Sequence, residues 1–418
     1  MLSVAEAVAR IMAAVQPLAE ETVPLGSALG RVLAADVISP VTLPHWTNSA
    51  MDGYAVHGDD VRGARDDAPV ELPVIESVAA GAFPARALGR GEATRIMTGA
   101  PLPEGADTVV RVEDTDAGLS RVRILKGRDA GKNIRLRGED LTEGSIALPR
   151  GIPVGAAQVG ILASVGQALA RVHRRPRVAI LGSGDELVDL DRFDEVRAGR
   201  KIVSSNSYTL DALVRTAGGV PIGLGHSADT LGEMRALLER ALEQRPDVVV
   251  TSAGVSVGEF DHTRTALEAM GATMDFWKVR MRPGAPLGFG MIRGTPWIGL
   301  PGNPVSAMVT FELFVRPVLC RMLGHTRLHR RPVSVTLEEP VSIGARLTHF
   351  YRAIVRTRDD GTLSARLTGP QGSGILTSMS LANALLVVPE DRPQVEAGER
   401  LTALLLSEDA GTAEAFAL

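Results

Sequence analysis

A run of valines from Val248 to Val250 constrains the fold of this chain more than any other feature. Consecutive β-branched residues suit a parallel strand that is buried on both faces, because a half-exposed strand would alternate apolar and polar side chains. Small residues follow between Thr251 and Ser256, and they let the backbone approach a ligand at the carboxyl end of the strand, where open α/β sheets place their sites. The stretch therefore predicts an α/β domain with a ligand site at this strand end.

Two acidic residues close the same stretch. Glu259 and Asp261 follow the small residues directly. Carboxylates beside a phosphate-binding loop would repel the phosphate unless a cation lay between them, so the pattern favours Mg²⁺ and a phosphorylated ligand. A tight strand-to-helix turn with two solvated acids is the alternative reading of this stretch.

Length and composition narrow the class of protein. A chain of 418 residues is too long for one hydrophobic core, so several domains are expected, and a net charge of −4 gives no reason to expect nucleic acid or an anionic membrane as a partner. The one cysteine, Cys320, cannot form a disulfide within the chain, which fits a reducing compartment. The apolar segment from Leu2 to Leu18 is interrupted by Glu6 and Arg10, which favours a cytosolic amphipathic helix over a secretion signal. We therefore expect a cytoplasmic protein without a membrane span.

Three patterns follow one another along the chain. Residues 46–145 contain short β-like runs separated by Gly and Pro, which predict a small β module. Residues 173–328 alternate strand and helix patterns, which predict a doubly wound parallel α/β domain. Residues 329–418 are again rich in β-like runs and predict a small β-barrel or sandwich, with a polar tail after Ser407.

Three loops of the predicted α/β domain should meet at the carboxyl edge of its sheet. These loops, 182–187, 251–261 and 301–306, each bring Gly, Ser or Asn, and backbone amides in such loops hold phosphate oxygens. Pro304 suits the first turn of the helix that follows the third loop. The nearby carboxylates of Glu186, Asp229 and Asp261 predict Mg²⁺ ligation or hydrolytic acid–base work. Asp229 considered alone favours a helix cap, because it precedes the amphipathic segment from Thr230.

A cationic face is expected on the segment from Lys278 to Arg282. Lys278, Arg280 and Arg282 stand at alternate positions and would share one face of an extended segment. An exposed basic strand edge is the alternative. Two unit charges about 4 Å apart interact by roughly 4 kcal/mol at an effective dielectric of about 20, so carboxylates would repel a dianionic substrate strongly. An anionic substrate would therefore need both this cationic face and a metal ion.

A series of motifs, taken together, resembles one family. In chain order they occupy residues 48–55, 96–103 with 105–110, 137–140, 184–187, 254–258 with Asp261, 276–279 and 300–306. In this order they resemble the molybdopterin molybdenumtransferases, which are related to the E domain of gephyrin and its plant counterpart. The resemblance covers nearly the whole chain.

The resemblance implies an activity, partners and a domain plan. It implies insertion of molybdate into adenylylated molybdopterin, with Mg²⁺-dependent hydrolysis that releases AMP and the molybdenum cofactor, by a homodimer that could meet a molybdopterin adenylyltransferase and apo-molybdoenzymes. A related adenylyltransferase activity and a non-enzymatic scaffold of the same fold are the alternatives. The expected parts are an N-terminal helix (1–22), a linker domain (23–45 and 146–172), an inserted β domain (46–145), a molybdopterin-binding α/β domain (173–328) and a C-terminal β-barrel (329–418).

Site residues are implied by the same motifs. The implied catalytic residues are Asp52, Thr98, Asp140, Glu186, Asp229 and Asp261, the last three also as Mg²⁺ ligands. The implied substrate-binding residues are Ser183, Gly184, Ser252, Gly254, Ser256, Gly258, Lys278, Arg282, Pro301, Gly302, Asn303, Pro304, Ser306, Arg352 and Ser373. The chain departs from the family pattern at Thr47, where Asp is usual, at Ala253, where a second Gly is usual, and at Arg282 and Ala285, where Lys is common. Arg for Lys keeps the charge and changes its geometry, whereas Ala285 removes a charge.

Overall fold

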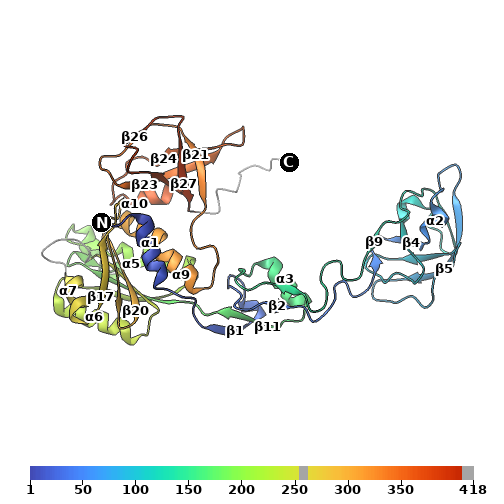
Figure 1. Ribbon diagram of the computed structural model, residues 1–418, viewed down its shortest axis with the longest axis horizontal. Coiled ribbons are helices and arrows are strands. Elements are labelled where there is room, and N and C mark those ends of the chain that lie inside the picture. The colour runs from blue at the N-terminus through green and yellow to red at the C-terminus, as the bar shows by residue number, and fades with distance from the viewer. Residues whose placement is uncertain (254–261, 407–418) are drawn as a thin grey trace. The chain divides into compact units, whose positions relative to one another are not determined.

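The structure, a computed structural model, describes residues 1–253 and 262–406 and divides the chain into two units. The first unit contains residues 1–34, 151–155 and 171–418, and the second contains residues 35–150 and 156–170. Figure 1 shows both units, with the α/β sheet and the C-terminal strands in the first and a β module in the second.

A six-stranded sheet organises the first unit, in the order β15-β12-β16-β20-β19-β17. Its strands are β12 (Arg177–Ser183), β15 (Val220–Ser227), β16 (Val248–Ser252), β17 (Thr273–Lys278), β19 (Pro286–Ile292) and β20 (Thr295–Leu300). The first four strands in spatial order run parallel, whereas β19 pairs antiparallel with both β20 and β17. The expected parallel α/β domain is confirmed, but it carries an antiparallel edge that the sequence patterns did not predict.

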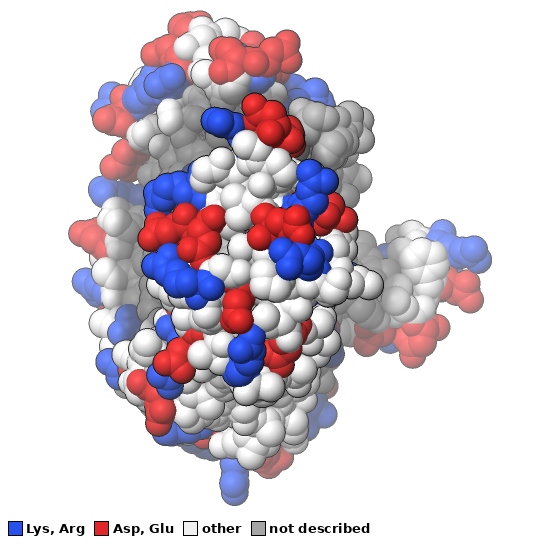
Figure 2. Space-filling view, turned by 90° about the vertical axis from the view of Figure 1, so that its right-hand side faces the viewer, with Lys and Arg blue, Asp and Glu red and all other residues white. Residues whose placement is uncertain are grey.

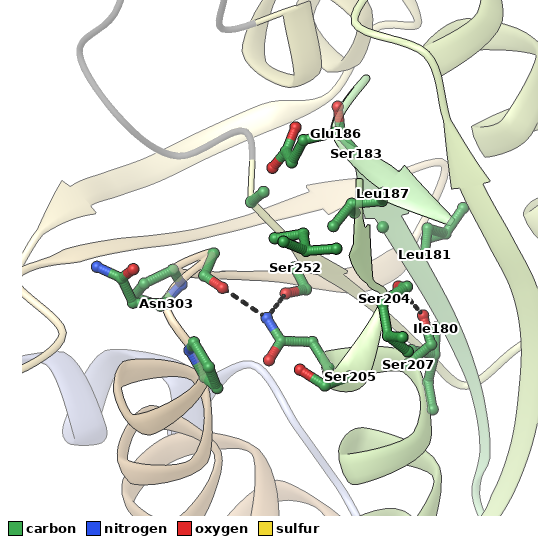
Figure 3. Close-up of a pocket in the computed structure, with 18 of the residues that line it drawn as sticks. Ile180, Leu181, Ser183, Glu186, Leu187, Ser204, Ser205, Ser207, Ser252 and Asn303 are labelled. Carbon is green, nitrogen blue, oxygen red and sulfur yellow. Dashed lines mark hydrogen bonds between the residues drawn. The ribbon is translucent and has the colours of Figure 1, made fainter. Parts of the chain in front are cut away.

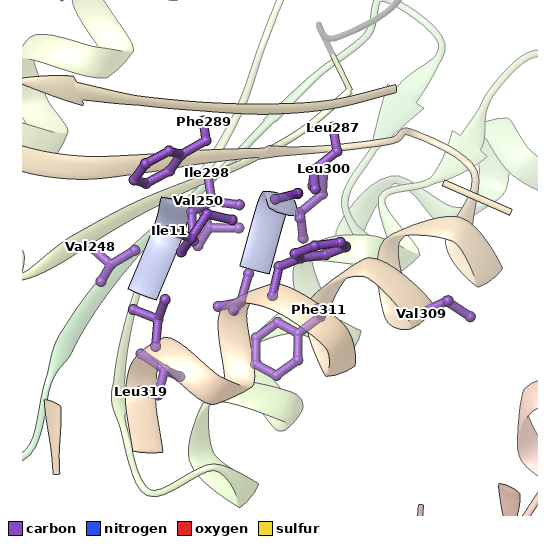
Figure 4. Packing of buried hydrophobic residues seen from close by; sticks show 14 of the residues in the cluster. Ile11, Val248, Val250, Leu287, Phe289, Ile298, Leu300, Val309, Phe311 and Leu319 are labelled. Carbon is purple, nitrogen blue, oxygen red and sulfur yellow. The ribbon is translucent and has the colours of Figure 1, made fainter. Parts of the chain in front are cut away.

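Helices cover both faces of this sheet because its central strands are apolar on both faces. On β12, Val178 and Ile180 face one helical layer, and Ala179 and Leu181 face the other. Figure 4 shows the first layer, in which Ile11 and Phe311 pack against Val250 and Ile298. The run that begins at Val248 is therefore a doubly buried strand, as its sequence predicts.

The helices of the first unit begin and end at defined residues. They are α1 (Val4–Ala13), α4 (Phe193–Arg197), α5 (Ser205–Thr216), α6 (Leu231–Glu243), α7 (His262–Ala269), α8 (Pro304–Thr310), the π-helical η4 (Phe311–Val315), α9 (Arg316–Met322) and α10 (Leu376–Leu381), with the 3₁₀ turns η1 (Leu25–Ser27) and η3 (Leu190–Arg192). Ser3 and Glu6 form a capping box at α1, which buries Ala7 and Ile11. Pro304 begins α8, as predicted. None of the described helices is long and apolar enough to cross a membrane.

A closed five-stranded barrel forms the C-terminal part of the first unit. Its strands are β21 (Pro332–Leu337), β23 (Thr348–Thr357), β24 (Leu363–Leu367), β25 (Ala384–Val388) and β27 (Arg400–Leu405). The order β23-β24-β21-β27-β25 closes through pairing of β25 with β23, and the short strand β18 (Met281–Arg282) adds to β23 in parallel. The expected barrel is confirmed, and β18 joins it to the chain segment that leaves the α/β sheet.

Short strands complete the first unit. They are β1 (Glu20–Pro24), which pairs with β11 (Leu169–His173), β13 (Leu187–Val188), which pairs with β14 (Ile202–Val203), and β22 (Val341–Ser342), which pairs with β26 (Gln394–Val395). The β13 and β14 pair holds the segment from residue 184 to residue 204 beside the carboxyl end of β12. This segment supplies part of the site described below.

The second unit contains a five-stranded sheet in the order β7-β4-β6-β5-β8. Its elements are β2 (Val37–Ile38), β3 (Asn48–Ser49), β4 (Gly53–Val56), α2 (Gly58–Val61), β5 (Val70–Val78), β6 (Ala93–Ile96), β7 (Thr108–Arg111), η2 (Val112–Asp114), β8 (Arg121–Ile124), β9 (Ile134–Arg135), β10 (Ile146–Leu148) and α3 (Ala156–Ser164). The pair β3-β9 lies outside the main sheet, as does the pair β2-β10. The expected β module is confirmed, with Tyr54 and Val110 in its core.

Figure 2 shows one face of the molecule, on which Lys and Arg side chains lie interspersed with Asp and Glu around uncharged surface. The described residues of this face therefore form no continuous basic surface of the kind that binds a nucleic-acid backbone. That agrees with the net charge of −4.

Candidate functional site

A cavity of about 440 Å³ opens at the carboxyl edge of the α/β sheet. Its walls come from the ends of β12, β16 and β20 and from the start of α5, where parallel sheets place their ligands. In Figure 3, Glu186 and Ser183 lie at one end of the cavity, Ser205 and Ser207 at the other, and Ser252 between them. The loops that the sequence predicted to converge do so here.

The predicted site residues fall into three groups in the first unit. Those that line the cavity are Ser183, Glu186, Ser252, Pro301, Gly302, Asn303 and Pro304. Those of the first unit that do not line it are Gly184, Asp229, Lys278, Arg282, Ser306, Arg352 and Ser373. Those that lie outside the described residues are Gly254, Ser256, Gly258 and Asp261. Glu259 also lies outside them.

Two helical segments begin at the cavity without a side-chain cap. Ser204 is the N-cap of α5 and Asn303 is the N-cap of α8, and neither side chain accepts a hydrogen bond from a backbone N–H of its helix. The Ser204 hydroxyl instead shares a hydrogen bond of 2.7 Å with the Ser207 hydroxyl. Neither first turn contains an acidic residue. By contrast, Ser3 caps α1 and Thr230 caps α6.

A helix start carries free N–H groups and a partial positive charge of about half a unit, so the uncapped start of α5 favours an anion in the cavity. At α8, Pro304 has no N–H and the Val305 N–H donates to the Ser373 carbonyl at 3.1 Å.

Asn206 is a cavity residue whose position the sequence patterns did not predict. Its side-chain nitrogen donates to the hydroxyl of Ser252 and to the carbonyl of Gly302, each at 2.7 Å. A carbonyl can only accept, so this contact fixes which end of the amide faces Gly302. Asn206 thus ties β16 and the 301–304 loop to the start of α5. The polar run from Ser204 to Ser207 directly after a strand was the signal that could have revealed it.

Glu186 presents its carboxylate to the cavity free of protein partners. The residue is exposed, and the described part of the chain supplies its carboxylate with no hydrogen bond or ion pair. Gly184 lies next to this carboxylate with a φ of +150°, and a Cβ at this position would lie 2.6 Å and 2.8 Å from the two carboxylate oxygens. Glycine is therefore needed at residue 184 to leave Glu186 in place.

Asp229 does not cap a helix; its carboxylate bonds Ser183, a residue that lines the cavity. The expectation that it caps α6 is wrong, because Thr230 is the N-cap and accepts from the Glu233 N–H. Asp229 instead accepts a hydrogen bond of 2.5 Å from the Ser183 hydroxyl. Its backbone N–H donates to the Asp185 carboxylate at 3.1 Å. Within residues 1–253 and 262–406, no group of three or more His, Cys, Asp or Glu side chains is placed to hold a metal ion.

Exposed and buried side chains alternate along the segment 278–282, as predicted, but this segment does not form one strand. Lys278, Arg280 and Arg282 are exposed, whereas Val279 and Met281 between them are fully buried. Lys278 ends β17 in the α/β sheet and Arg282 belongs to β18 beside the barrel. Arg280 lies 3.6 Å from the Glu390 carboxylate. The three cations therefore share an exposed side of a segment that crosses from one sheet to the other.

Arg352 carries a buried guanidinium on the barrel strand β23. It is fully buried, its Nε donates to the Ser378 hydroxyl and one Nη donates to the Gly372 carbonyl, each at 3.0 Å. Its other Nη has no partner in the described chain, and burial lowers the pKa of the guanidinium. Ser373, next to Gly372, accepts a hydrogen bond from Asn303 at 3.0 Å. The 372–373 turn thus connects the buried cation to the rim of the cavity.

The remaining predicted residues lie in the second unit. Asp52 and Thr98 meet in a turn, where the Thr98 N–H and hydroxyl both donate to the same Asp52 oxygen at 2.7 Å. These two hydrogen bonds, the backbone one first, lower the pKa of Asp52. Asp140 lies in a separate turn, where its backbone N–H donates to the Leu43 carbonyl.

We expect Thr98→Val to raise the pKa of Asp52 towards its ordinary value, because the hydroxyl donor is lost while the backbone donor remains. A lowered carboxyl pKa stabilises the folded state above the unfolded pKa and loses that contribution as pH falls through the folded pKa, so the variant should lose less stability on acidification. Carboxyl-carbon NMR of labelled aspartate measures the titration, with Thr98→Ser as the control that keeps the donor. An unchanged Asp52 titration in Thr98→Val would contradict the assignment.

Ala253 adopts a backbone conformation that usually requires glycine. Its φ is +74°, at the point where the chain leaves β16 for the cavity. Its N–H donates to the Leu300 carbonyl at 3.0 Å, and a Cβ on Gly302 would lie 3.3 Å from the Ala253 methyl. The left-handed conformation costs an alanine about 1–2 kcal/mol, so this departure from the family pattern stores strain at the site.

Ala253→Gly is expected to stabilise the first unit by about 0.5–1 kcal/mol, because relief of the left-handed conformation outweighs the larger entropy of glycine in the unfolded chain. The thermal midpoint of unfolding measures the effect. Ala253→Val is the matched comparison and should lower the midpoint, since a β-branched residue tolerates positive φ worse than alanine. A lower midpoint for Ala253→Gly would show that the methyl contributes packing that exceeds the strain.

Comparisons with known proteins agree with one another across the chain. Family models match residues 2–166 (MoeA N-terminal region, domain I and II), 179–321 (probable molybdopterin binding domain) and 334–406 (MoeA C-terminal region, domain IV). The chain is 39% identical to molybdopterin molybdenumtransferase 2 of Mycobacterium tuberculosis over 94% of this chain and 96% of that protein. It is 38% identical to molybdopterin molybdenumtransferase of Nostoc over 92% of this chain and 88% of that protein. The crystal structure of the molybdopterin biosynthesis moeA protein from Pyrococcus horikoshii matches with a TM-score of 0.83 and 29% identity, over 97% of this chain and 100% of that chain.

Proposed function

Because the chain belongs to the molybdopterin molybdenumtransferase family, we propose that it is an enzyme that inserts molybdenum into molybdopterin, and that its substrate is adenylylated molybdopterin. In this proposal molybdate is the second substrate, and the pyrophosphate link is hydrolysed with release of AMP. The names of the relatives support molybdenum insertion, and the cavity supports the phosphorylated form of the pterin.

The observation that carries the proposal is the uncapped start of α5 at the cavity. The first N–H groups of α5 lie at the cavity, and the residues Ser205 and Ser207 of the same turn line it. The start of α8 contributes less, because Pro304 has no N–H and the Val305 N–H donates to the Ser373 carbonyl at 3.1 Å. Free N–H groups such as those of α5 bind phosphate oxygens without a neutralising side chain. A volume of about 440 Å³ lies within the usual range for a small-molecule site, so the cavity suits a pterin phosphate.

The described carboxylates fit a magnesium ion by their chemistry. Mg²⁺ prefers oxygen ligands and is commonly held by one or two carboxylates together with substrate phosphates. Glu186 has a carboxylate free of protein partners, and Asp229 lies behind Ser183 at the same end of the cavity. In the proposal these two residues hold the ion together with Asp261, which lies outside the described residues. When bound, the ion would neutralise phosphate charge and activate water for hydrolysis.

Within the proposal, the chain's own residues bind and orient both substrates. The start of α5 holds the pterin phosphate, and Asn206 fixes the ends of β16 and of the 301–304 loop at the cavity. Glu186 holds a negative charge at the open end, where it can accept a proton from an attacking water. Lys278, Arg282, Arg352 and Ser373 would bind molybdate, and the link from Asn303 through Ser373 connects this anion site with the cavity.

A reconstituted reaction tests the function directly. Purified protein, adenylylated molybdopterin, molybdate and Mg²⁺ should yield AMP and molybdenum cofactor, measured by nucleotide chromatography and by transfer of the cofactor to an apo-molybdoenzyme. Omission of molybdate or of Mg²⁺ should abolish product formation. With free molybdopterin and ATP the protein should accumulate no adenylylated pterin. Accumulation of that species, or failure to release AMP from it under all conditions, would overturn the proposal in favour of adenylyltransfer or of a scaffold.

A further inference from the structure

No basic side chain lines the described wall of the cavity at the carboxyl edge of the α/β sheet. Among the described residues of this wall, Glu186 is the only charged one. Residues 254–261, which lie outside the described part, contain no Lys, Arg or His. The proposed substrate carries a pterin phosphate joined to a nucleotide phosphate, and the start of α5 accounts for the first of them. A cationic side chain that binds the second phosphate must therefore come from beside the wall.

Lys201 is a cation beside the end of the cavity that Glu186 occupies in Figure 3. Its ammonium donates a hydrogen bond to the Asp185 carbonyl, which belongs to the peptide group that joins Asp185 to Glu186. The next residue, Ile202, lines the cavity, and its N–H donates to the Glu186 carbonyl at 2.9 Å. Two contacts therefore hold Lys201 and its neighbour against the turn that carries Glu186.

No carboxylate of the described chain neutralises the charge of Lys201. The Asp185 carboxylate accepts a hydrogen bond from the Asp229 backbone N–H at 3.1 Å and forms no ion pair with Lys201. By contrast, Arg192 of the same 185–203 segment pairs with Glu195 at 2.6 Å. An ammonium has three N–H donors, and the described chain takes up one of them with a neutral acceptor. The other donors and the full charge are therefore available to an anion.

We propose that Lys201 binds the nucleotide phosphate of adenylylated molybdopterin, and that the site prefers this substrate to molybdopterin because of this contact. The inference rests on the proposed function, which supplies the second phosphate. Lysine binds phosphate as a point charge on a flexible stem, so its ammonium can turn from the carbonyl towards the ligand. The carboxylates of Asp185 and Glu186 would repel a phosphate at this end of the cavity, and the ammonium of Lys201 would offset that repulsion.

A purely structural role is the alternative explanation of Lys201. The bond from the ammonium to the Asp185 carbonyl orients a peptide group of the 184–187 turn. A neutral N–H at the same place would orient it equally well, because a carbonyl accepts from either kind of donor. The structural role thus depends on the donor alone, whereas phosphate binding depends on the charge. Variants that separate donor from charge distinguish the two.

Binding of adenylylated molybdopterin and of molybdopterin to the full-length protein, with molybdate and Mg²⁺ omitted, tests the inference. The ratio of the two dissociation constants should favour the adenylylated form in the wild type. Lys201→Met should reduce this preference at least about tenfold, because a hydrogen bond between charged groups is lost, and Lys201→Arg should retain most of it. Nε-acetyllysine at residue 201 keeps an N–H for the Asp185 carbonyl and removes the charge, so it should reduce the preference as methionine does.

Arg200→Met is the matched control for the loss of one positive charge. Arg200 is an exposed cation at the adjacent position, it does not line the cavity, and it forms no ion pair with a described carboxylate. This variant should keep the preference of the wild type. The thermal midpoint of each variant checks that the first unit remains folded.

Several outcomes would overturn the inference. An unchanged preference in Lys201→Met would do so, as would equal affinity of the wild type for the two pterins. A preference that survives with acetyllysine would assign Lys201 to the turn. An equal loss of affinity for both pterins would assign it to the pterin phosphate, and an equal effect of Arg200→Met would assign the effect to the net charge of the segment.

The inference and the proposed function can fail separately. A preference that depends on Lys201, in a protein that releases no AMP in the complete reaction, would refute only the function. Full AMP release by Lys201→Met at an unchanged KM for adenylylated molybdopterin would refute only the inference.

Discussion

Glu186→Gln is expected to lower molybdate-dependent AMP release by about 100-fold or more while the protein remains folded. The amide keeps the size of the side chain and removes its charge. Because the described chain gives the Glu186 carboxylate no hydrogen bond or ion pair, the substitution removes no protein contact and should leave the thermal midpoint unchanged. Activity is measured as AMP released from adenylylated molybdopterin, and pterin affinity by calorimetry, which we expect to change little.

Asp191→Asn is the matched control, since Asp191 is an exposed carboxylate of the same 185–203 segment that does not line the cavity. It should retain wild-type turnover. Gly184→Ala should lower turnover less than Glu186→Gln does, because the added methyl would meet the Glu186 carboxylate, which ends an exposed side chain and can turn aside while it keeps its charge. Wild-type turnover in Glu186→Gln would remove this carboxylate from the mechanism, whatever Gly184→Ala does.

The pattern of apolar and polar residues along the chain predicted those strands whose position depends only on which side chains are buried. The valine run at Val248 must be buried on both faces, and the barrel strands alternate or are β-rich, so both could be recognised from residue types. The antiparallel strand β19 could not, because Gly288 and Gly290 interrupt its apolar pattern. Both glycines are required by packing, since a Cβ on Gly288 would lie 2.5 Å from the Trp297 ring and one on Gly290 would lie 2.5 Å from the Thr273 carbonyl. That reason depends on a neighbouring strand and is invisible along the chain.

The sequence predicted which loops form the candidate site, but it did not predict which side chains in those loops contact one another. The rule that parallel strands end at a common edge correctly brought Ser183, Ser252 and Asn303 to one cavity. It could not predict that Asn206 reaches across to two of these loops, or that Asp229 bonds Ser183 instead of capping α6. Both contacts join residues at least 46 positions apart, so they depend on the register of the folded sheet.

Arg352→Met is expected to raise the molybdate concentration needed for half-maximal activity at least about tenfold and to leave thermal stability equal or higher. A buried charge without a charged partner costs several kcal/mol, and methionine fills a similar apolar volume at no such cost. The guanidinium makes two hydrogen bonds to neutral acceptors and leaves one Nη unsatisfied in the described chain. The stability of the fold therefore does not explain why an arginine is buried at residue 352. An oxyanion that accepts a hydrogen bond from the unpaired Nη would explain it.

The two explanations of Arg352 predict opposite results for the same variant. If Arg352 serves structure alone, Arg352→Met should lower the thermal midpoint and leave the molybdate requirement unchanged. If it binds the oxyanion, the midpoint should hold and the requirement should rise, with Arg352→Lys intermediate because it keeps the charge and loses the planar fork. The guanidinium is fully buried and one Nη donates to the Gly372 carbonyl, so we expect that an oxyanion can reach it only if the 372–373 turn shifts. Ser373→Ala, which cuts the hydrogen bond from Asn303, should then change the molybdate requirement more than pterin affinity, and an equal change in both would assign Ser373 to the cavity instead.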